Sequence, residues 1–308
     1  MSILISKEMN YKNLIKNLLE PPKYHYSSKF LNKINFQKIR CNIENKKYKK
    51  NSLKFKPDRK IPLSIKKSID TNGYVILENF FSSQDFNDLE KSFNSYSKSN
   101  RVNYQSNYYN MIWGSGLISS NSDKQHDADL IINLFNKKKT IILDIVSYIL
   151  KKNITGELEL SYQDLKLMDE REDDLDPNRL LHSDRHYHCA KAYFLIEDNH
   201  EFNSPYVYCP KSHLIDEKRI NFENKISRYK SFNNIKYHIS KNDLYNLGIQ
   251  EKNIIASKNS LVISDNIGIH KRGKMLKGFT RKQIRISFHY LQANFLQKAL
   301  RSIIRKIM

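Results

Sequence analysis

Two histidines and an aspartate are the residues of this chain best suited to hold a metal ion. His182 and Asp184 are separated by one residue, and His270 follows 88 residues after His182. In a β-strand, side chains two positions apart point to the same face, so His182 and Asp184 can reach one point. Two imidazoles and one carboxylate on one face of an octahedral ion form the facial triad of non-haem Fe(II) oxygenases. The spacing therefore predicts a metal site with its remaining coordination positions open.

Three arginines beyond His270 are candidates for binding an acidic cosubstrate. Arg281 lies 11 residues after His270, and a guanidinium can hold the far carboxylate of a 2-oxoacid through two parallel hydrogen bonds. Arg285 shares the strand face of Arg281 and is the alternative for this role. Arg272 either contacts the cosubstrate or an anionic substrate, or is a solvated loop charge.

The segment that follows Arg281 alternates between apolar and polar residues, as a half-buried strand does. Its apolar residues are Ile284, Ile286, Phe288 and Tyr290, and its polar residues are Gln283, Arg285, Ser287 and His289. Arg281 is in phase with the polar face. We expect the apolar face to pack against the fold and the polar face to line a site, although the period alone does not decide which face points inward.

The elements that must position these residues change type along the chain. Alternation predicts a strand over 73–80, and helical spacing predicts helices over 128–135 and 139–150, after a middle loop. From Glu157 onward we expect strands near 157–168, 190–196, 205–209, 253–256, 260–264 and 282–291. An acidic loop lies at 171–176, and an insert with helical period lies around 214–229. Short strands separated by loops predict a sandwich or barrel.

The order of these motifs resembles the phytanoyl-CoA dioxygenase family over residues 67–290. Besides the His-x-Asp triplet, the segments that carry the resemblance are Gly73-Tyr-Val-Ile-Leu, Asn203-Ser-Pro205, Cys209-Pro-Lys-Ser-His213, Asp265-Asn-Ile-Gly-Ile-His270 and Gly278-Phe-Thr-Arg281. Ser204 and Lys211 stand where the family has glycines, the residue that most readily accepts a positive φ.

The resemblance implies a mainly β, α+β fold: a double-stranded β-helix, also called a jelly roll or cupin-like core, with flanking helices. It implies that His182, Asp184 and His270 bind Fe(II), and that Arg281 pairs with the C5 carboxylate of 2-oxoglutarate. The expected reaction consumes O2 and 2-oxoglutarate, hydroxylates a C–H bond of a small-molecule substrate, and releases succinate and CO2. The basic loop 271–277 indicates an anionic substrate.

Other histidines follow the triplet. His186 and His188 continue the two-residue phase of His182 and Asp184. The triad is complete without them, and we interpret both as structural residues or as residues that support the metal ligands.

The oxygenase domain is expected at residues 61–293, between two basic appendages. Residues 1–60 hold 16 Lys and Arg against 4 Asp and Glu, so they carry +12 of the net charge of +21. We interpret them as an extension with a helix over 11–19, followed by loop or linker. Residues 294–308 predict a basic amphipathic helix that caps the domain, or alternatively lies on an anionic membrane surface.

Composition leaves other classes of function open. The chain is rich in Lys, Asn and Ile, whose codons are rich in A and T. Its positive charge therefore reflects either codon bias, with the lysines on a solvated surface, or a specific anionic partner. The alternatives to an oxygenase are a catalytically inactive jelly-roll binding protein and a basic nucleic-acid or membrane-surface binder. Three cysteines without metal-ligand spacing predict reduced thiols in a cytoplasmic protein. The sequence contains no apolar run of 18 residues, so no transmembrane helix is expected.

Overall fold

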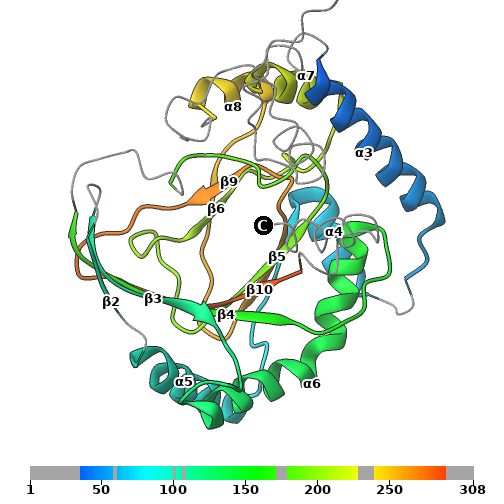
Figure 1. The fold of residues 1–308 in the computed structure, drawn as a ribbon. Helices are drawn as coiled ribbons and strands as arrows, with labels where there is room; N and C mark the ends of the chain where they lie inside the picture. The colour runs from blue at the N-terminus through cyan, green and yellow to red at the C-terminus, as the bar shows by residue number, and fades with distance from the viewer. Residues whose placement is uncertain are drawn as a thin grey trace, which may run out of the picture.

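The computed structural model describes residues 35–57, 61–99, 102–105, 109–170, 179–227 and 239–288. Its centre consists of two antiparallel sheets that curve around a common interior (Figure 1). The large sheet contains, in spatial order, β1 (Tyr74–Leu77), β8 (Leu261–Asp265), β5 (Ala190–Leu195), β10 (Thr280–Ser287), β4 (Glu159–Glu170), β3 (Tyr109–Leu117) and β2 (Val102–Gln105). The small sheet contains β7 (Lys252–Ile254), β6 (Tyr206–Tyr208) and β9 (His270–Arg272).

The path of the chain between the two sheets identifies the fold. After β4 in the large sheet, His182 pairs with His270 at the edge of the small sheet. The chain then enters the large sheet at β5, the small sheet at β6 and β7, the large sheet at β8, the small sheet at β9 and the large sheet at β10. This winding between two facing antiparallel sheets is that of a jelly roll. The predicted double-stranded β-helix is therefore confirmed.

Helices cover the outside of this core. Two of them, α5 (Ser83–Lys98) and α6 (Gln125–Leu150), pack on the outer face of the large sheet, while α4 (Leu63–Asn72) leads into β1 (Figure 1). The apolar residues of β10 face them: Ile284 and Ile286 are fully buried in the same cluster as Phe194 of β5. The outer face of the large sheet is thus the main hydrophobic core.

Three further helices lie beyond the small sheet and along its side: α3 (Phe36–Lys54), α7 (Glu217–Ile226) and α8 (Lys241–Leu247) (Figure 1). Helix α3 packs against α7, where the Asn45 side-chain amide donates to the carbonyl oxygen of Ile215. Farther along α3, the Tyr48 hydroxyl donates to the carbonyl oxygen of Ile149 at the end of α6. These contacts attach α3 to the jelly roll.

Three predictions of local structure are wrong. The two helices expected over 128–135 and 139–150 are one helix, α6, because the polar residues Asn136 and Lys137 between them lie on its exposed side. The middle loop contains β2 and β3, which extend the large sheet beyond β4. The linker expected before residue 60 contains α3, whose apolar period is weak and whose position depends on tertiary contacts with α7.

The two turns that lack the glycines of the resembled family keep the left-handed conformation. Ser204 has φ 66° and Lys211 has φ 68°. Such angles cost a residue with a side chain roughly 1–2 kcal/mol, so both turns are formed against local strain.

Several predictions concern residues outside the described ranges: the helix over 11–19, the acidic loop 171–176, the end of the last strand at His289 and Tyr290, and the helix over 294–308. Within the described ranges, no helix is both long enough and apolar enough to cross a membrane. The three cysteines, Cys41, Cys189 and Cys209, are buried and free.

Candidate metal centre

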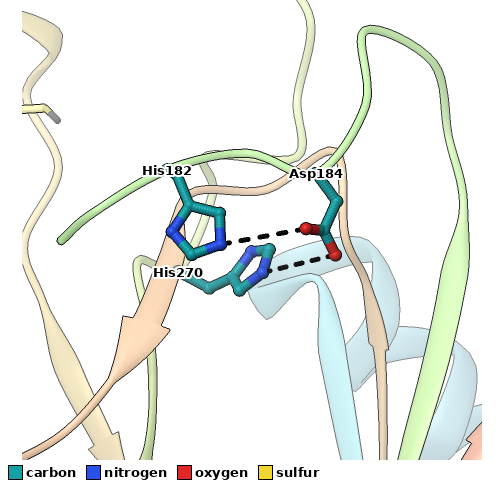
Figure 2. A group of neighbouring side chains, drawn as sticks. All are labelled: His182, Asp184 and His270. Atoms are coloured by element: carbon teal, nitrogen blue, oxygen red, sulfur yellow. Dashed lines mark ion pairs between the residues drawn. The ribbon is translucent and has the colours of Figure 1, made fainter. Parts of the chain in front are cut away.

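His182, Asp184 and His270 converge at one point inside the jelly roll (Figure 2). His182 Nε2 lies 3.8 Å from Asp184 Oδ1, and His270 Nε2 lies 3.6 Å from Asp184 Oδ2. One nitrogen or oxygen atom from each residue lies within 4.8 Å of the others, and all three side chains are buried. Among the described residues, this is the one group of three His, Cys, Asp or Glu side chains that could hold a metal ion.

Backbone pairing brings together these residues, which are far apart in the sequence. The amide of His182 donates to the carbonyl oxygen of His270 at 2.9 Å, and the reverse bond measures 2.8 Å. The amide of Asp184 donates to the carbonyl oxygen of Asn266 at 3.1 Å. The segment that carries the His-x-Asp triplet is thereby held against the segment that carries the second histidine.

Each histidine is oriented by a backbone carbonyl. His182 Nδ1 lies 2.6 Å from the carbonyl oxygen of Leu180, and His270 Nδ1 lies 2.9 Å from that of Gly268. A carbonyl oxygen only accepts, so Nδ1 is the donor in both rings, and Nε2 is the atom that each ring turns toward Asp184. Metal-binding histidines are commonly fixed in this way. The site is a two-histidine, one-carboxylate metal site. Its donors fit a divalent transition-metal ion.

Two polar side chains hold the aspartate. The ammonium group of Lys191, on β5, donates to Asp184 Oδ2. Burial lowers the pKa of Lys191, but the charges of Asp184 and Tyr193 and the hydrogen bond to Asp184 together raise it above its ordinary value. The amide nitrogen of Asn266 lies 3.1 Å from the same oxygen and 3.3 Å from His270 Nε2. Lys191 therefore supplies the counter-charge of the carboxylate.

Lys191 and Asn266 were not identified from the sequence. Lys191 did carry a signal, because it is the one charged residue in the apolar strand 190–196. Such a residue is expected to be paired when the strand is buried. Asn266 carries no comparable signal, since its role depends on how the turn after β8 is placed.

Two tyrosines line the interior beside the histidines. The ring of Tyr206 lies 5.6 Å from the ring of His270, and the ring of Tyr193 lies 5.2 Å from that of Tyr206, both measured between centroids. The Tyr206 hydroxyl is 3.1 Å from Ser264 Oγ. This aromatic wall lies next to His270.

The polar face of β10 also faces this interior. Burial and, after it, the charge of Arg272 lower the pKa of Arg281 to about 10, although Tyr193 opposes the shift. Arg281 Nε donates to Gln283 Oε1 at 3.2 Å, and no carboxylate of the described residues lies within ion-pairing distance of Arg281. Arg285 instead donates to Ser161 Oγ at 3.2 Å. Arg281 is thus a half-buried guanidinium close enough to Arg272 to feel its charge.

The two histidines interpreted as structural stay outside the triad. His188 Nδ1 lies 2.5 Å from Asp265 Oδ2, on the side of the chain away from the metal ligands. The pKa of His186 lies well below its ordinary value. Burial is the main cause, and the positive charges of Arg40 and Arg185 add to it.

The sequence matches no family model and no curated protein, so membership of the phytanoyl-CoA dioxygenase family stays a prediction. Solved structures do match. The epimerase SnoN, in complex with Fe3+, alpha ketoglutarate and nogalamycin RO, has a TM-score of 0.48 at 11% identity, covering 72% of this chain and 81% of its own. AviO1 from Streptomyces viridochromogenes Tue57 has a TM-score of 0.47 at 12% identity, covering 75% and 94%.

A third match is EctD from S. alaskensis with bound Fe, with a TM-score of 0.47 at 15% identity over 75% of this chain and 77% of that chain. All three TM-scores lie below 0.5. The fold is therefore assigned from the strand order, and the chemistry from the geometry of the site.

Proposed function

We propose that this protein is an Fe(II)- and 2-oxoglutarate-dependent dioxygenase of the phytanoyl-CoA dioxygenase type, which hydroxylates a C–H bond of a small-molecule substrate. The observation that carries the proposal is the pair of buried imidazoles with protonated Nδ1 atoms, both presenting Nε2 to one carboxylate. Two imidazoles and one carboxylate, with open positions, favour Fe(II) among the transition metals. The remaining positions would accept the 2-oxoacid and O2.

Arg281 is the proposed partner of the C5 carboxylate of 2-oxoglutarate. It lies on the inner face of β10, it is half-buried, and its Nε donates to the neutral amide oxygen of Gln283. A dianion would supply the missing counter-charge. Arg285 is less suited, since its Nε is directed to Ser161. Arg272 acts on Arg281 through its charge and would strengthen the attraction for a dianion.

When bound, iron and 2-oxoglutarate supply the oxidation itself: O2 and 2-oxoglutarate are converted to succinate and CO2 while the substrate gains a hydroxyl group. The protein's residues position and shield these groups. His182 and His270 donate from Nδ1 to backbone carbonyl oxygens, Lys191 and Asn266 fix the carboxylate of Asp184, and Tyr193 and Tyr206 line the interior beside the histidines.

The finer expectations belong to the same proposal. The basic loop 271–277 favours an anionic substrate, and an Fe(II) enzyme is suited to the cytoplasm, where ferrous iron and 2-oxoglutarate are both present. The catalytic domain is proposed to span residues 61–293, with 294–308 as a capping helix. Helix α3, from the N-terminal 60 residues, packs against this domain.

Turnover of the cosubstrate tests this proposal. Purified protein supplied with Fe(II), 2-oxoglutarate and air should form succinate slowly even without its substrate, as measured by proton NMR. His270→Ala and Asp184→Asn should form none, because each removes a metal ligand. Equal succinate from wild type and both variants, or none from wild-type protein that binds Fe(II), would contradict the proposal.

A further inference from the structure

A cleft lies between helix α3 and the outer side of the chain segment that follows Asp184. Its volume is about 840 Å³, which falls within the range of roughly 300–1,000 Å³ that is typical of small-molecule sites. One wall is α3, the opposite wall is the turn after α6 at 150–154, and part of its lining comes from residues 186–188.

The N-terminal half of α3 contributes an apolar surface to the cleft. Phe36, Ile39 and Ile43 line it at helical spacing. Ile39 is 46% exposed and Ile43 is 58% exposed, which is unusual for side chains of this type. At a rise of 1.5 Å per residue, this strip is about 10 Å long, which matches a short apolar chain or an aromatic ring system.

The remainder of the lining is strongly basic. Six cationic side chains line the cleft: Arg40, Lys47, Lys54, Lys56, Lys151 and Lys152. One acidic residue, Glu44, accompanies them, and it lies 3.6 Å from Lys47. The excess of positive charge beside an apolar strip complements a molecule that carries both an apolar body and an anionic group.

Lys151 shows that part of this charge is built into the wall. Its ammonium nitrogen lies 3.4 Å from the ring centroid of Tyr148 and 3.9 Å from Asp70 Oδ1, and its side chain is only 13% exposed. Burial lowers its pKa from the ordinary value, although Asp70 opposes the shift. A buried ammonium with one distant carboxylate is suited to a further anionic partner.

The His188 side of the lining is rigid and polar. The imidazole of His188 stacks on the ring of Tyr48, with centroids 3.5 Å apart and planes inclined by 17°. Its Nδ1 is held by Asp265, while Nε2 has no hydrogen-bond partner among the described residues and is not fully enclosed. The ring thus presents Nε2 as a fixed polar group at the edge of the cleft.

None of the three metal ligands lines the cleft, and neither do Arg281 or Lys191. The His182 and Asp184 side chains point into the jelly roll, whereas His188 pairs with Asp265 on its outside. The cleft is therefore a second site, separated from the metal centre by the chain segment that bears two of its ligands.

We infer that this cleft binds a small amphipathic anion, with one carboxylate or phosphate among the lysines and an apolar chain or ring against Phe36, Ile39 and Ile43. This inference does not rest on the proposed oxygenase activity. It follows from the volume of the cleft, its apolar strip and its six-to-one excess of basic over acidic residues.

Isothermal titration calorimetry with four ten-carbon probes tests the inference. Decanoate and decyl phosphate should bind saturably, and the tighter of the two identifies the preferred anionic group. Decanol and decyltrimethylammonium share the apolar chain but lack the negative charge, and they should bind roughly tenfold more weakly or not at all. Binding should persist in EDTA and in excess 2-oxoglutarate, which would separate it from the metal centre.

Matched variants of α3 locate the site. Ile43→Asp and Lys54→Glu place a negative charge in the cleft and should weaken binding of the anions roughly tenfold or more. Leu53→Asp and Lys50→Glu make the same changes at exposed positions of α3 outside the cleft and should leave binding unchanged. All four positions are solvent-exposed or cleft-facing, and melting curves check that the variants fold.

The inference is overturned if neither anion binds saturably, if Ile43→Asp and Lys54→Glu bind like wild type, or if EDTA abolishes binding. Equal binding of decanol and decanoate would also overturn it, because the basic residues would then have no role.

Discussion

The two faces of the large sheet bury different kinds of side chain. On the outer face, Phe194, Ile284 and Ile286 pack with α5 and α6 in an apolar cluster. On the inner face, the same strands present Lys191 and Gln283, which are also largely buried but hydrogen-bonded. Apolar burial stabilises a fold, whereas buried charge costs stability unless it is paired. The comparison indicates that the outer face holds the jelly roll together and the inner face serves the metal centre.

The largest expected loss of stability without an effect on the site comes from the outer face. Phe194→Ala removes a fully buried ring that contacts four others, Phe80, Phe81, Phe86 and Phe135. The free energy of unfolding should fall by about 3–5 kcal/mol, measured by urea denaturation. Added Mn(II) should raise the stability of this variant by the same amount as wild type, because the metal binds the two folded states equally.

The matching change on the inner face is Lys191→Met, which leaves the buried Asp184 carboxylate without its ammonium partner. Stability without metal should fall by roughly 3–5 kcal/mol. Here Mn(II) should recover more stability than it adds to wild type, because the ion replaces the lost positive charge. Lys191→Arg is the control that keeps the charge. If Mn(II) stabilised Lys191→Met no more than Phe194→Ala, the proposed division between the two faces would fail.

Variants of the two arginines of β10 test which of them binds the carboxylate of 2-oxoglutarate on the inner face. Arg281→Ala should weaken binding of 2-oxoglutarate to the metal-loaded protein by roughly 2–5 kcal/mol, because a buried charge loses its partner. Arg285→Ala should have little effect, since that guanidinium bonds Ser161. Calorimetric titration of both variants measures the difference. A larger effect of Arg285→Ala would mean that Arg285, and not Arg281, binds the carboxylate.

The smallest effect concerns a neutral pair inside the jelly roll. Gln283 Nε2 donates to Gln163 Oε1 between β10 and β4. Gln163→Met leaves the amide group of the buried Gln283 without this partner but keeps its bond to Arg281, and it should cost at least about 1 kcal/mol of stability. In a double-mutant cycle measured in urea, the loss caused by Gln163→Met should be smaller when Gln283 has already been replaced by Met. Additive losses would show that the pair is not coupled.

The sequence predicted the parts of this molecule that depend on a local period. The alternation after Arg281 correctly separated an apolar packing face from a polar inner face. His182 and Asp184 do converge as predicted, but from an isolated bridge and a bend rather than from the expected strand. The fold followed from the order of motifs, and the winding of the strands confirms it.

Other features depend on contacts that no local pattern encodes. Helix α3 has a weak apolar period and forms where it can pack against α7. Strands β2 and β3 pair beside β4, with an irregular register at Asn110 and Met111. The bond between Lys191 and Asp184 depends on which face of β5 points inward, which a single lysine cannot specify.

Anaerobic titration of the purified protein with Fe(II) and 2-oxoglutarate tests the central claim most directly. Chelation of 2-oxoglutarate by iron at a facial triad gives a weak visible absorption band near ~500 nm. We predict this band in wild type, its loss in His270→Ala, and its weakening in Arg281→Ala. No band from folded, iron-loaded wild-type protein would mean that the three converging side chains do not bind iron and 2-oxoglutarate together.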